Sequence, residues 1–492
     1  MLISVNEQEK SLKADKIDRV FLQSVDFIIL VMTDSPSVGS LPLSRFKLAI
    51  IGIFIFSLVL RFWKLTQFNV LVFDEVYYAK FANFYWLGKP FFGSHPPLSH
   101  YLIALGIWFG SLFPASPDTV NELTGSLRST WSYRWLNALT GSFVPLLVGA
   151  IAYEWTARRR FTLIVMVLAA LDGLFLVESR YALNNIYLIV FGLLGHLFFF
   201  YYLNRGKRCY LTLAGIFLGC AGSVKWNGFA FLLGIYLFIL AIFAQQAYYR
   251  FVKKTDPLPP LSPFQQAIAQ TPIPRLIADL IIFPLVTYCV IWIPHFMINP
   301  EYGFWGIQKE IWNYHRRIGN TPDVHPYCSP WYSWLVLWRP VAYYYATAKP
   351  HNLVYDVHSM ANPILLWFSS LSILILLGIR ILQSVSPFKS HFLANELTLY
   401  IGLNYAANLL PWLKINRCTF FYHYMAAYLF SWFALALILD SLFGSRSKIE
   451  RWFAGSMLGL IAMGFLFWLP IFLGLPLLPQ SFSLRMLFPS WI

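Results

Sequence analysis

The sequence predicts an all-α integral membrane protein with about eleven transmembrane helices. Of its 492 residues, 58% are hydrophobic and only 12% are charged, whereas soluble globular domains carry roughly 25% charged residues. Aromatic residues make up 19% of the chain, which suits the interfacial belts of a membrane protein. This composition excludes an ordinary soluble domain.

Long hydrophobic segments predict the individual helices. A hydrocarbon core of roughly 30 Å requires about 20 apolar residues in helical form. We predict spans at residues 47–64, 132–154, 161–178, 183–203, 210–224, 228–248, 276–297, 361–383, 394–413, 419–440 and 452–474. The shorter apolar stretch 98–113 is expected to lie along the membrane surface, or to enter the membrane and return.

The distribution of positive charge predicts the orientation. The net charge is +15, and 14 Lys and Arg residues lie in five short loops, at 158–160, 205–208, 250–254, 380–389 and 446–451. The positive-inside rule places these loops and the N-terminus in the cytoplasm. Nucleic-acid binding is not predicted, because the basic residues separate hydrophobic spans instead of forming one soluble face.

This topology divides the chain into five regions. They are a cytoplasmic N-terminal segment 1–46, a transmembrane core 47–298 with an external loop 65–131, an external loop 299–360, a four-helix transmembrane region 361–474 and an external tail 475–492. The N-terminus lacks a signal-peptide pattern, so the first span is expected to remain as an anchor, with Met32 as an alternative start. The loop 299–360 shows little strand-like alternation, and no separate soluble domain is predicted there.

The five cysteines show no CxxC spacing and no companion His pattern, so they predict neither a zinc site nor a disulfide framework. Only Cys328 and Cys418 fall in external regions. They could pair in an oxidising compartment, but we predict two unrelated thiols.

Two adjacent carboxylates, Asp74 and Glu75, follow the first span by about ten residues. The aromatic residues after them are Tyr77, Tyr78, Phe81, Phe84, Tyr85 and Trp86. This composition is typical of the headgroup layer, so the two acids are expected at the membrane surface, outside the hydrocarbon.

In this topology the short external loops contain Arg180, Lys225, Lys414 and Arg417, and Arg134 stands at the external end of the second span, against the positive-inside bias. An anionic ligand would explain them. Snorkelling of each side chain to lipid phosphate would explain them equally well.

The acidic loop resembles the first external loop of the protein O-mannosyltransferases. That family has an Asp-Glu pair, an aromatic helix with a Lys, and then His-Pro-Pro-Leu. Here these are Asp74-Glu75, Lys80 and the segment 95–98. The family pattern usually continues with Gly-Lys, where this chain has Ser99-His100.

Later segments resemble further motifs of the same family, in the expected order, from about residue 60 to nearly 430. They are Tyr133-Arg134, Glu178-Ser179-Arg180, Ser223-Val224-Lys225-Trp226, His325-Pro326-Tyr327 with Ser329, Trp331, Trp334 and Arg339-Pro340, and Arg417 with Phe420 and Tyr422-His423-Tyr424. The resemblance implies a C-type glycosyltransferase (GT-C) fold, with interfacial helices in the first external loop. It also implies the shorter bacterial type, without a β-trefoil insert in 299–360.

The activity implied by the resemblance is transfer of mannose, with inversion, from a polyprenyl-phosphate carrier to Ser or Thr hydroxyls of exported proteins. Such a transfer needs a base for the hydroxyl proton, while the phosphate leaves without protonation, so one carboxylate suffices. We predict that Asp74 is the base and that Glu75 orients it or pairs with Lys80.

The implied donor-phosphate residues are Arg134, Arg180, Lys225 and Arg417. The candidate substrate-binding residues are His95, His325, Tyr327, Trp331, Tyr422 and His423.

The expected partners are the polyprenyl-phosphate sugar donor, a Ser/Thr-containing polypeptide and the lipid bilayer. No cofactor is predicted, although the sequence leaves a divalent cation open, and it does not predict an oligomeric state. The expected location is the cell membrane, with the active site outside.

Two alternatives stay open: transfer of another sugar to a lipid or glycan, and a transporter or flippase for polyprenyl-linked sugars, for which Asp172 is the main buried acid.

Overall fold

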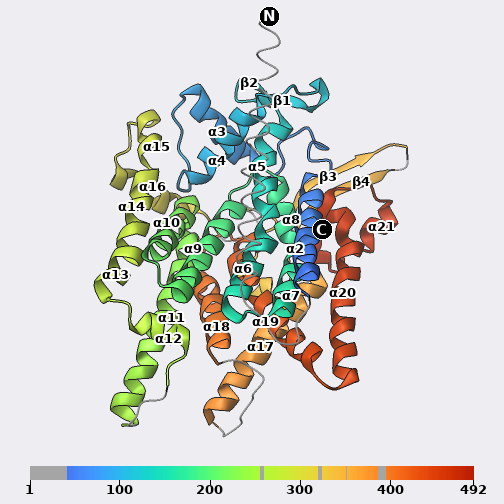
Figure 1. Cartoon of the computed structure of the whole chain (residues 1–492). Helices are drawn as coiled ribbons and strands as arrows, with labels where there is room; N and C mark the ends of the chain where they lie inside the picture. Colours follow the sequence, from blue (N-terminus) through green and yellow to red (C-terminus); the bar gives the residue numbers. More distant parts are fainter. Residues whose placement is uncertain (1–41, 255–259, 320–323, 351, 386–394) are drawn as a thin grey trace, which may run out of the picture.

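The computed structural model describes residues 42–254, 260–319, 324–350, 352–385 and 395–492. These residues form a bundle of helices with two small antiparallel hairpins (Figure 1). Most of the predicted N-terminal segment 1–46, including Met32, lies outside the described residues, as does part of the basic loop 380–389.

The first three predicted spans are all helical, and two of them are interrupted. The first is α2 (Leu43–Phe62). The second consists of α5 (Thr130–Ser142) and α6 (Val144–Thr156), which together form one apolar segment. The third consists of α7 (Arg159–Ala170) and α8 (Gly173–Arg180), which meet at an angle of 57°. The bend falls at Asp172, whose extended backbone and side chain cap the start of α8.

The other predicted spans are also helical. The helices are α9 (Asn185–Arg205), α10 (Arg208–Val224), α11 (Phe229–Ala247), α13 (Ile273–Ile277), α14 (Phe283–Ile291), α15 (Ile293–Ile298), α17 (Pro363–Val385), α18 (Asn395–Leu409), α19 (Met425–Gly444) and α20 (Lys448–Leu473). Short helices α12 (Pro263–Ala269) and α21 (Pro479–Ser483) lie between or after them. A π-helical turn at Ala278–Ile282 joins α13 to α14.

Within the described ranges, eight helices are long and apolar enough to cross a membrane, or nine if the bent pair α7 and α8 makes one span. Two further helices, α10 and α18, have 17 and 15 residues and fall short of that length. The chain is therefore a multi-pass membrane protein. The count of eleven spans stays a prediction.

Two short helices and a hairpin occupy the first long loop, as the sequence predicts for the helices. They are α3 (Glu75–Leu87), α4 (Leu98–Gly110), β1 (Val120–Leu123) and β2 (Ser126–Ser129). With 13 residues, α4 is only about 20 Å long, too short to span the hydrocarbon. Figure 1 shows α3, α4 and the hairpin together at one end of the bundle.

The second long loop contains more β-structure than predicted. After α16 (Phe304–Arg317), strands β3 (Val341–Ala348) and β4 (Leu353–Ser359) form an antiparallel hairpin. The expectation of little strand character was wrong here. The run Tyr343–Tyr345 hides the alternation, because three identical residues in a row occupy buried, half-buried and exposed positions.

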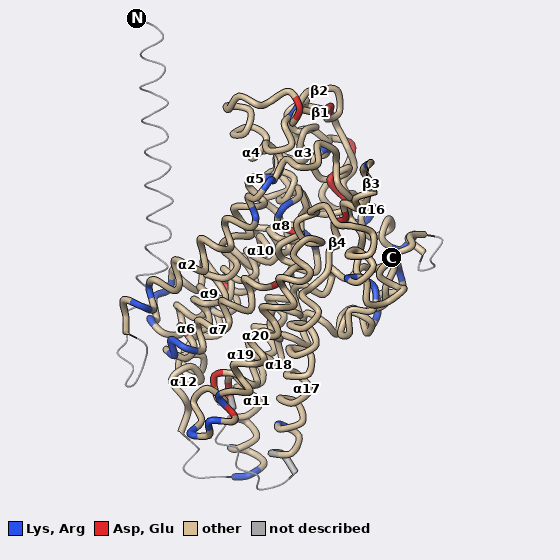
Figure 2. The backbone as a smooth tube through the Cα atoms, turned by 90° about the vertical axis from the view of Figure 1, so that its right-hand side faces the viewer, with Lys and Arg blue, Asp and Glu red and all other residues tan. Residues whose placement is uncertain are grey.

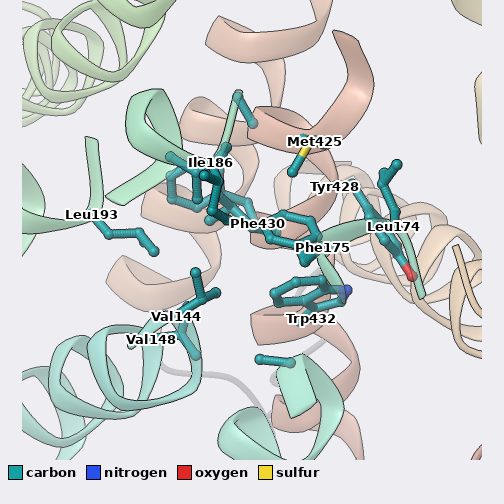
Figure 3. Close-up of a cluster of buried hydrophobic side chains, with 14 of the residues drawn as sticks. Val144, Val148, Leu174, Phe175, Ile186, Leu193, Met425, Tyr428, Phe430 and Trp432 are labelled. Atoms are coloured by element: carbon teal, nitrogen blue, oxygen red, sulfur yellow. The ribbon is translucent and has the colours of Figure 1, made fainter. Parts of the chain in front are cut away.

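The core of the bundle is apolar and closely packed. Figure 3 shows Val144 and Val148 of α6, Phe175 of α8, Ile186 of α9 and Trp432 of α19 pointing toward one another. The rings of Phe175 and Trp432 lie 4.6 Å apart between centroids. Figure 2 shows many Lys and Arg residues at the helix ends farthest from β1 and β2, which agrees with the predicted charge pattern.

Candidate active site

A cavity of about 330 Å³ lies where α3, α4 and α16 meet the segments before α11 and α19. Its walls include six of the twelve predicted site residues: Asp74, His95, Lys225, Arg417, Tyr422 and His423. The other lining residues are Tyr77, Tyr78, Phe81, Phe92, Ser94, His100, Tyr314, His315, Ile318 and Phe420. Residues from five separate segments therefore meet at one space.

One face of α3 forms the cavity wall. Asp74 stands at the N-cap position of the helix without a capping hydrogen bond from its side chain, and Tyr77, Tyr78 and Phe81 follow at spacings of three, four and seven residues. This spacing places all four on one side of an α-helix, over about 10 Å of its length. The local sequence thus directs the acid and three aromatic rings into the same space.

Asp74 is partly accessible where it lines the cavity and is otherwise enclosed by protein. Burial raises the pKa of its carboxyl to about 7, an effect that Lys225 opposes and Glu178 reinforces. A carboxylate with such a pKa can accept a proton near neutral pH.

The residue before Asp74 is held in an uncommon conformation. Phe73 has a φ of +49°, in the left-handed region that few non-glycine residues adopt. Its ring stacks on Tyr343 of β3, with centroids 4.2 Å apart, and meets Tyr422, Phe420 and His325 edge-on. The second long loop therefore fixes the backbone that leads into Asp74.

Lys225 enters the cavity from the break between α10 and α11. Its backbone is extended, and its Nζ lies 3.3 Å from Nε2 of His423 and 5.4 Å from the ring centroid of Tyr422. Burial lowers the pKa of Lys225 to about 7, with a further lowering from Arg417, while Asp74 opposes the shift.

Arg417 is the second cation of the cavity. Its Nη1 donates to the carbonyl of Cys418 at 3.1 Å, and burial lowers its pKa. The segment that carries it is fastened by a Cys328–Cys418 disulfide and by paired hydrogen bonds between Ser329 and Thr419. The prediction of two unrelated thiols was wrong: their Cα atoms lie 5.1 Å apart, although 90 positions separate them in sequence.

Glu75 lies outside the cavity, in a buried pair with Arg134. The guanidinium donates from Nε and Nη2 to the two carboxylate oxygens at 2.9 and 2.7 Å. Glu75 also accepts from the backbone N–H groups of Val72 and Ala182, at 2.8 Å each. The expected pairing with Lys80 is not found, and the partner is Arg134, 59 positions away.

The side chains of Arg134 and Arg180 hydrogen-bond to backbone carbonyls and do not line the cavity. Arg134 also donates to the carbonyls of Leu65, Phe68 and Val70, while Nη1 of Arg180 donates to the carbonyls of Leu60, Arg61 and Trp63. Both guanidinium groups therefore face backbone carbonyls in this structure, and the expected contact with the donor phosphate stays a prediction. We call Glu75, Arg134 and Arg180 the loop anchor.

His325, Tyr327 and Trp331 stand outside the cavity lining, in the second long loop. The ring of His325 meets Phe420 edge-on, with centroids 4.9 Å apart. Phe420 lines the cavity, so it lies between His325 and the cavity. Tyr327 contacts Arg339 through its ring, and Trp331 is partly buried.

Sequence reasoning missed several residues at the site. Glu178 does not line the cavity but reinforces the raised pKa of Asp74, and its carboxylate accepts from Tyr343, from Ser359 at 3.1 Å and from Asn185 at 3.0 Å. His100 and His315 also line the cavity. No motif identified His315, whereas His100 was visible as a departure from the family pattern.

Among the residues that the structure describes, no group of three or more His, Cys, Asp or Glu side chains is arranged to hold a metal ion. The cavity instead combines one carboxylate, two cations, several imidazoles and aromatic rings. Such a set can take a proton, bind an anion and contact a polar ring.

The fold matches membrane glycosyltransferases of known structure. The Saccharomyces cerevisiae protein O-mannosyltransferase Pmt1-Pmt2 complex, bound to the sugar donor, superposes with a TM-score of 0.74 at 16% identity, over 93% of both chains. ArnT from Cupriavidus metallidurans, bound to undecaprenyl phosphate, gives a TM-score of 0.51 at 13% identity, over 85% of this chain and 70% of that one. The chain therefore has the GT-C fold.

Sequence comparison narrows this class to a family. The family model for dolichyl-phosphate-mannose-protein mannosyltransferase matches residues 51–299, and that for the C-terminal four-transmembrane region of protein O-mannosyltransferase matches 300–491. The chain belongs to the protein O-mannosyltransferase family.

Relatives in this family include bacterial and animal proteins. The polyprenol-phosphate-mannose–protein mannosyltransferase of Corynebacterium glutamicum is 25% identical, over 91% of this chain and 94% of the relative. The Mycolicibacterium smegmatis protein of the same name is 24% identical, over 87% and 88%. Rat protein O-mannosyl-transferase 1 is 28% identical over 41% of this chain, and the match spans only 28% of the rat protein.

Proposed function

We propose that the protein transfers mannose from a polyprenyl-phosphate carrier to Ser or Thr hydroxyls of exported polypeptides, with inversion at the anomeric carbon. The observation that carries this proposal is the meeting of Asp74 with Lys225 and Arg417 in one cavity. The two full-length bacterial relatives bear names that describe this reaction.

In the proposed mechanism the acceptor hydroxyl attacks the anomeric carbon while its proton passes to Asp74. The bond from the anomeric carbon to the phosphate oxygen breaks, and polyprenyl phosphate leaves as an anion. Lys225 and Arg417 offset the charge that grows on this phosphate, each contributing on the order of 3 kcal/mol at the transition state. Glu75 acts from the loop anchor, where it fixes the start of α3 and thus the position of Asp74.

We further propose that this cavity opens on the external side of the cell membrane and that the N-terminus is cytoplasmic. The basic loops at 158–160, 205–208 and 446–451 support this orientation. The reaction as proposed needs no cofactor, since a carboxylate and two cations supply the proton transfer and the phosphate binding. Transfer that persists in a chelator would support that part of the proposal, and its loss would contradict it.

The transporter alternative receives no support from Asp172. This acid accepts from the N–H of Phe175 at 3.0 Å and the hydroxyl of Tyr428 at 2.9 Å, so it caps α8 and ties it to α19. A structural cap explains its burial without ion transport.

The direct test uses purified full-length protein, radiolabelled polyprenyl-phosphate mannose and a Ser/Thr-rich peptide. We expect label on the peptide with wild-type protein and none with a peptide in which every Ser and Thr is Ala. Label that appears on a lipid or glycan acceptor but never on the peptide would favour the other glycosyltransferase alternative. Lipid-linked sugar that crosses liposome membranes without transfer would favour a flippase.

A further inference from the structure

Among the described residues, His100 is a cavity-lining side chain whose buried ring nitrogens both lack a hydrogen-bond partner. It lies in the first turn of α4 and is 1% exposed. Burying an unpaired polar group is unfavourable, so a ring in this state is suited to a ligand that completes its hydrogen bonds.

The ring is held in place by apolar contacts alone. It stacks on Tyr78 at 5.7 Å and meets the edges of Phe81 and Phe91 at 5.5 and 6.1 Å. Gly93 leaves room for it, because a Cβ at that position would lie 3.3 Å from Cε1 of His100. Its orientation is therefore fixed before any ligand binds.

The position of His100 indicates what that ligand presents. Its neighbours Tyr78 and Phe81 lie one and two turns beyond Asp74 on the cavity face of α3. The cations Lys225 and Arg417 suit the phosphate of the donor, and His100 is packed among uncharged groups. A buried imidazole without an acidic partner stays neutral, so it offers one donor and one acceptor. A hydroxyl group matches both.

We propose that His100 is a sugar-recognition residue that hydrogen-bonds hydroxyl groups of the donor's hexose through its ring nitrogens. The choice of a hexose as ligand rests on the proposed function. Because the related pattern has Gly-Lys where this chain has Ser99-His100, the inference concerns this chain and not the family at large.

The test compares the binding of two lipids, polyprenyl-phosphate mannose and bare polyprenyl phosphate, to the full-length protein in nanodiscs. His100→Phe keeps the aromatic stack and removes both nitrogens. Loss of two hydrogen bonds should reduce the preference for the mannose-bearing lipid by about tenfold to hundredfold, with unchanged affinity for the bare lipid. An unchanged preference would overturn the proposal.

Two further variants test whether the effect is specific to the ring nitrogens of His100. His295→Phe is a matched control, because His295 also packs on Phe91 but does not line the cavity, and it should keep the full preference. His100→Gln retains a donor and an acceptor, so it should lose less than His100→Phe, and it replaces that variant if the latter does not fold. A preference lost equally in the His295 variant would contradict a specific role for His100.

Kinetics with modified donors provide a second measure. Wild-type protein should reject a donor that lacks the contacted hydroxyl, whereas His100→Phe should use that donor and the parent almost equally. Equal rejection by both proteins would contradict the proposal. If wild type transfers no mannose but the lipid preference still depends on His100, the proposed function fails and the sugar site stands.

Discussion

The loop anchor and the cavity use charged residues in opposite ways. In the anchor, Arg134 is saturated by the two oxygens of Glu75 and three backbone carbonyls. In the cavity, the Lys225 ammonium contacts the imidazole of His423 and the ring of Tyr422, and Arg417 donates to one carbonyl. Cations that look alike in the sequence therefore divide into those that hold backbone and those whose donors remain available to a ligand.

The adjacent acids show the same division. Asp74 and Glu75 are neighbours in sequence, yet one lines the cavity and the other is fully buried in an ion pair. The direction in which each leaves the start of α3 decides this, because successive helical residues point about 100° apart. Substitutions can test whether the two regions are functionally as separate as they are structurally.

The largest expected effect belongs to Asp74→Asn. The amide keeps the volume but cannot take a proton, so turnover should fall about a hundredfold to ten-thousandfold. Binding of the donor lipid should stay near the wild-type level. Turnover in the purified transfer assay measures this, and near-normal turnover would remove Asp74 from the role of base.

Next comes Arg134→Ala, whose effect should be on folding. Removing one partner leaves the buried Glu75 unpaired, which should lower the free energy of unfolding by about 3–5 kcal/mol. Thermal unfolding in detergent measures the loss. The sequence instead predicts a role for Arg134 in binding the donor phosphate. Full stability combined with weak donor binding would restore the original role.

Arg417→Ala should show the opposite pattern. We expect kcat/KM to fall about a hundredfold to a thousandfold, because a charge-stabilising donor is lost at the transition state. Thermal stability should change little, since its side chain makes only one hydrogen bond in the described structure. A large drop in stability without a catalytic effect would place Arg417 with the loop anchor.

The smallest expected effect is on pH dependence. Asp74 must be deprotonated to act as a base, and its pKa of about 7 means that activity rises as pH rises through this value. Lys225 must be protonated to bind phosphate, and its pKa of about 7 means that activity falls above it. A bell-shaped profile of kcat/KM should result, whose apparent pKa values belong to the coupled pair.

Lys225→Arg tests this assignment. Arginine stays protonated throughout the accessible range, so the fall at high pH should disappear while the rise at low pH remains. An unchanged alkaline limb would assign it to another group.

Much of the fold could be predicted because hydropathy and charge are local properties. The short helices α3 and α4 and the acid at the start of α3 could also be predicted. Residues that share one helical face, such as Asp74, Tyr78 and Phe81, lie within a few positions of one another in the sequence. The pairing of Glu75 with Arg134 was not, because it joins positions 59 apart and a single sequence carries no sign of contact. The disulfide was missed for the same reason, because its cysteines lie 90 positions apart. The hairpin of β3 and β4 is local, and it was missed because three consecutive tyrosines hide the alternation of β3.

The disulfide also constrains the order in which the protein can be assembled. Cys328 precedes α17 and α18, and Cys418 follows them. Under the predicted topology, in which residues 361–383 and 394–413 both cross the membrane, the two thiols can meet only after both segments have been inserted and the chain has returned to the same side. Because Arg417 is adjacent to Cys418, the end of the cavity that we propose binds phosphate would then be completed late in biogenesis. A host that does not oxidise the thiols on that side would produce inserted protein whose site is unfinished.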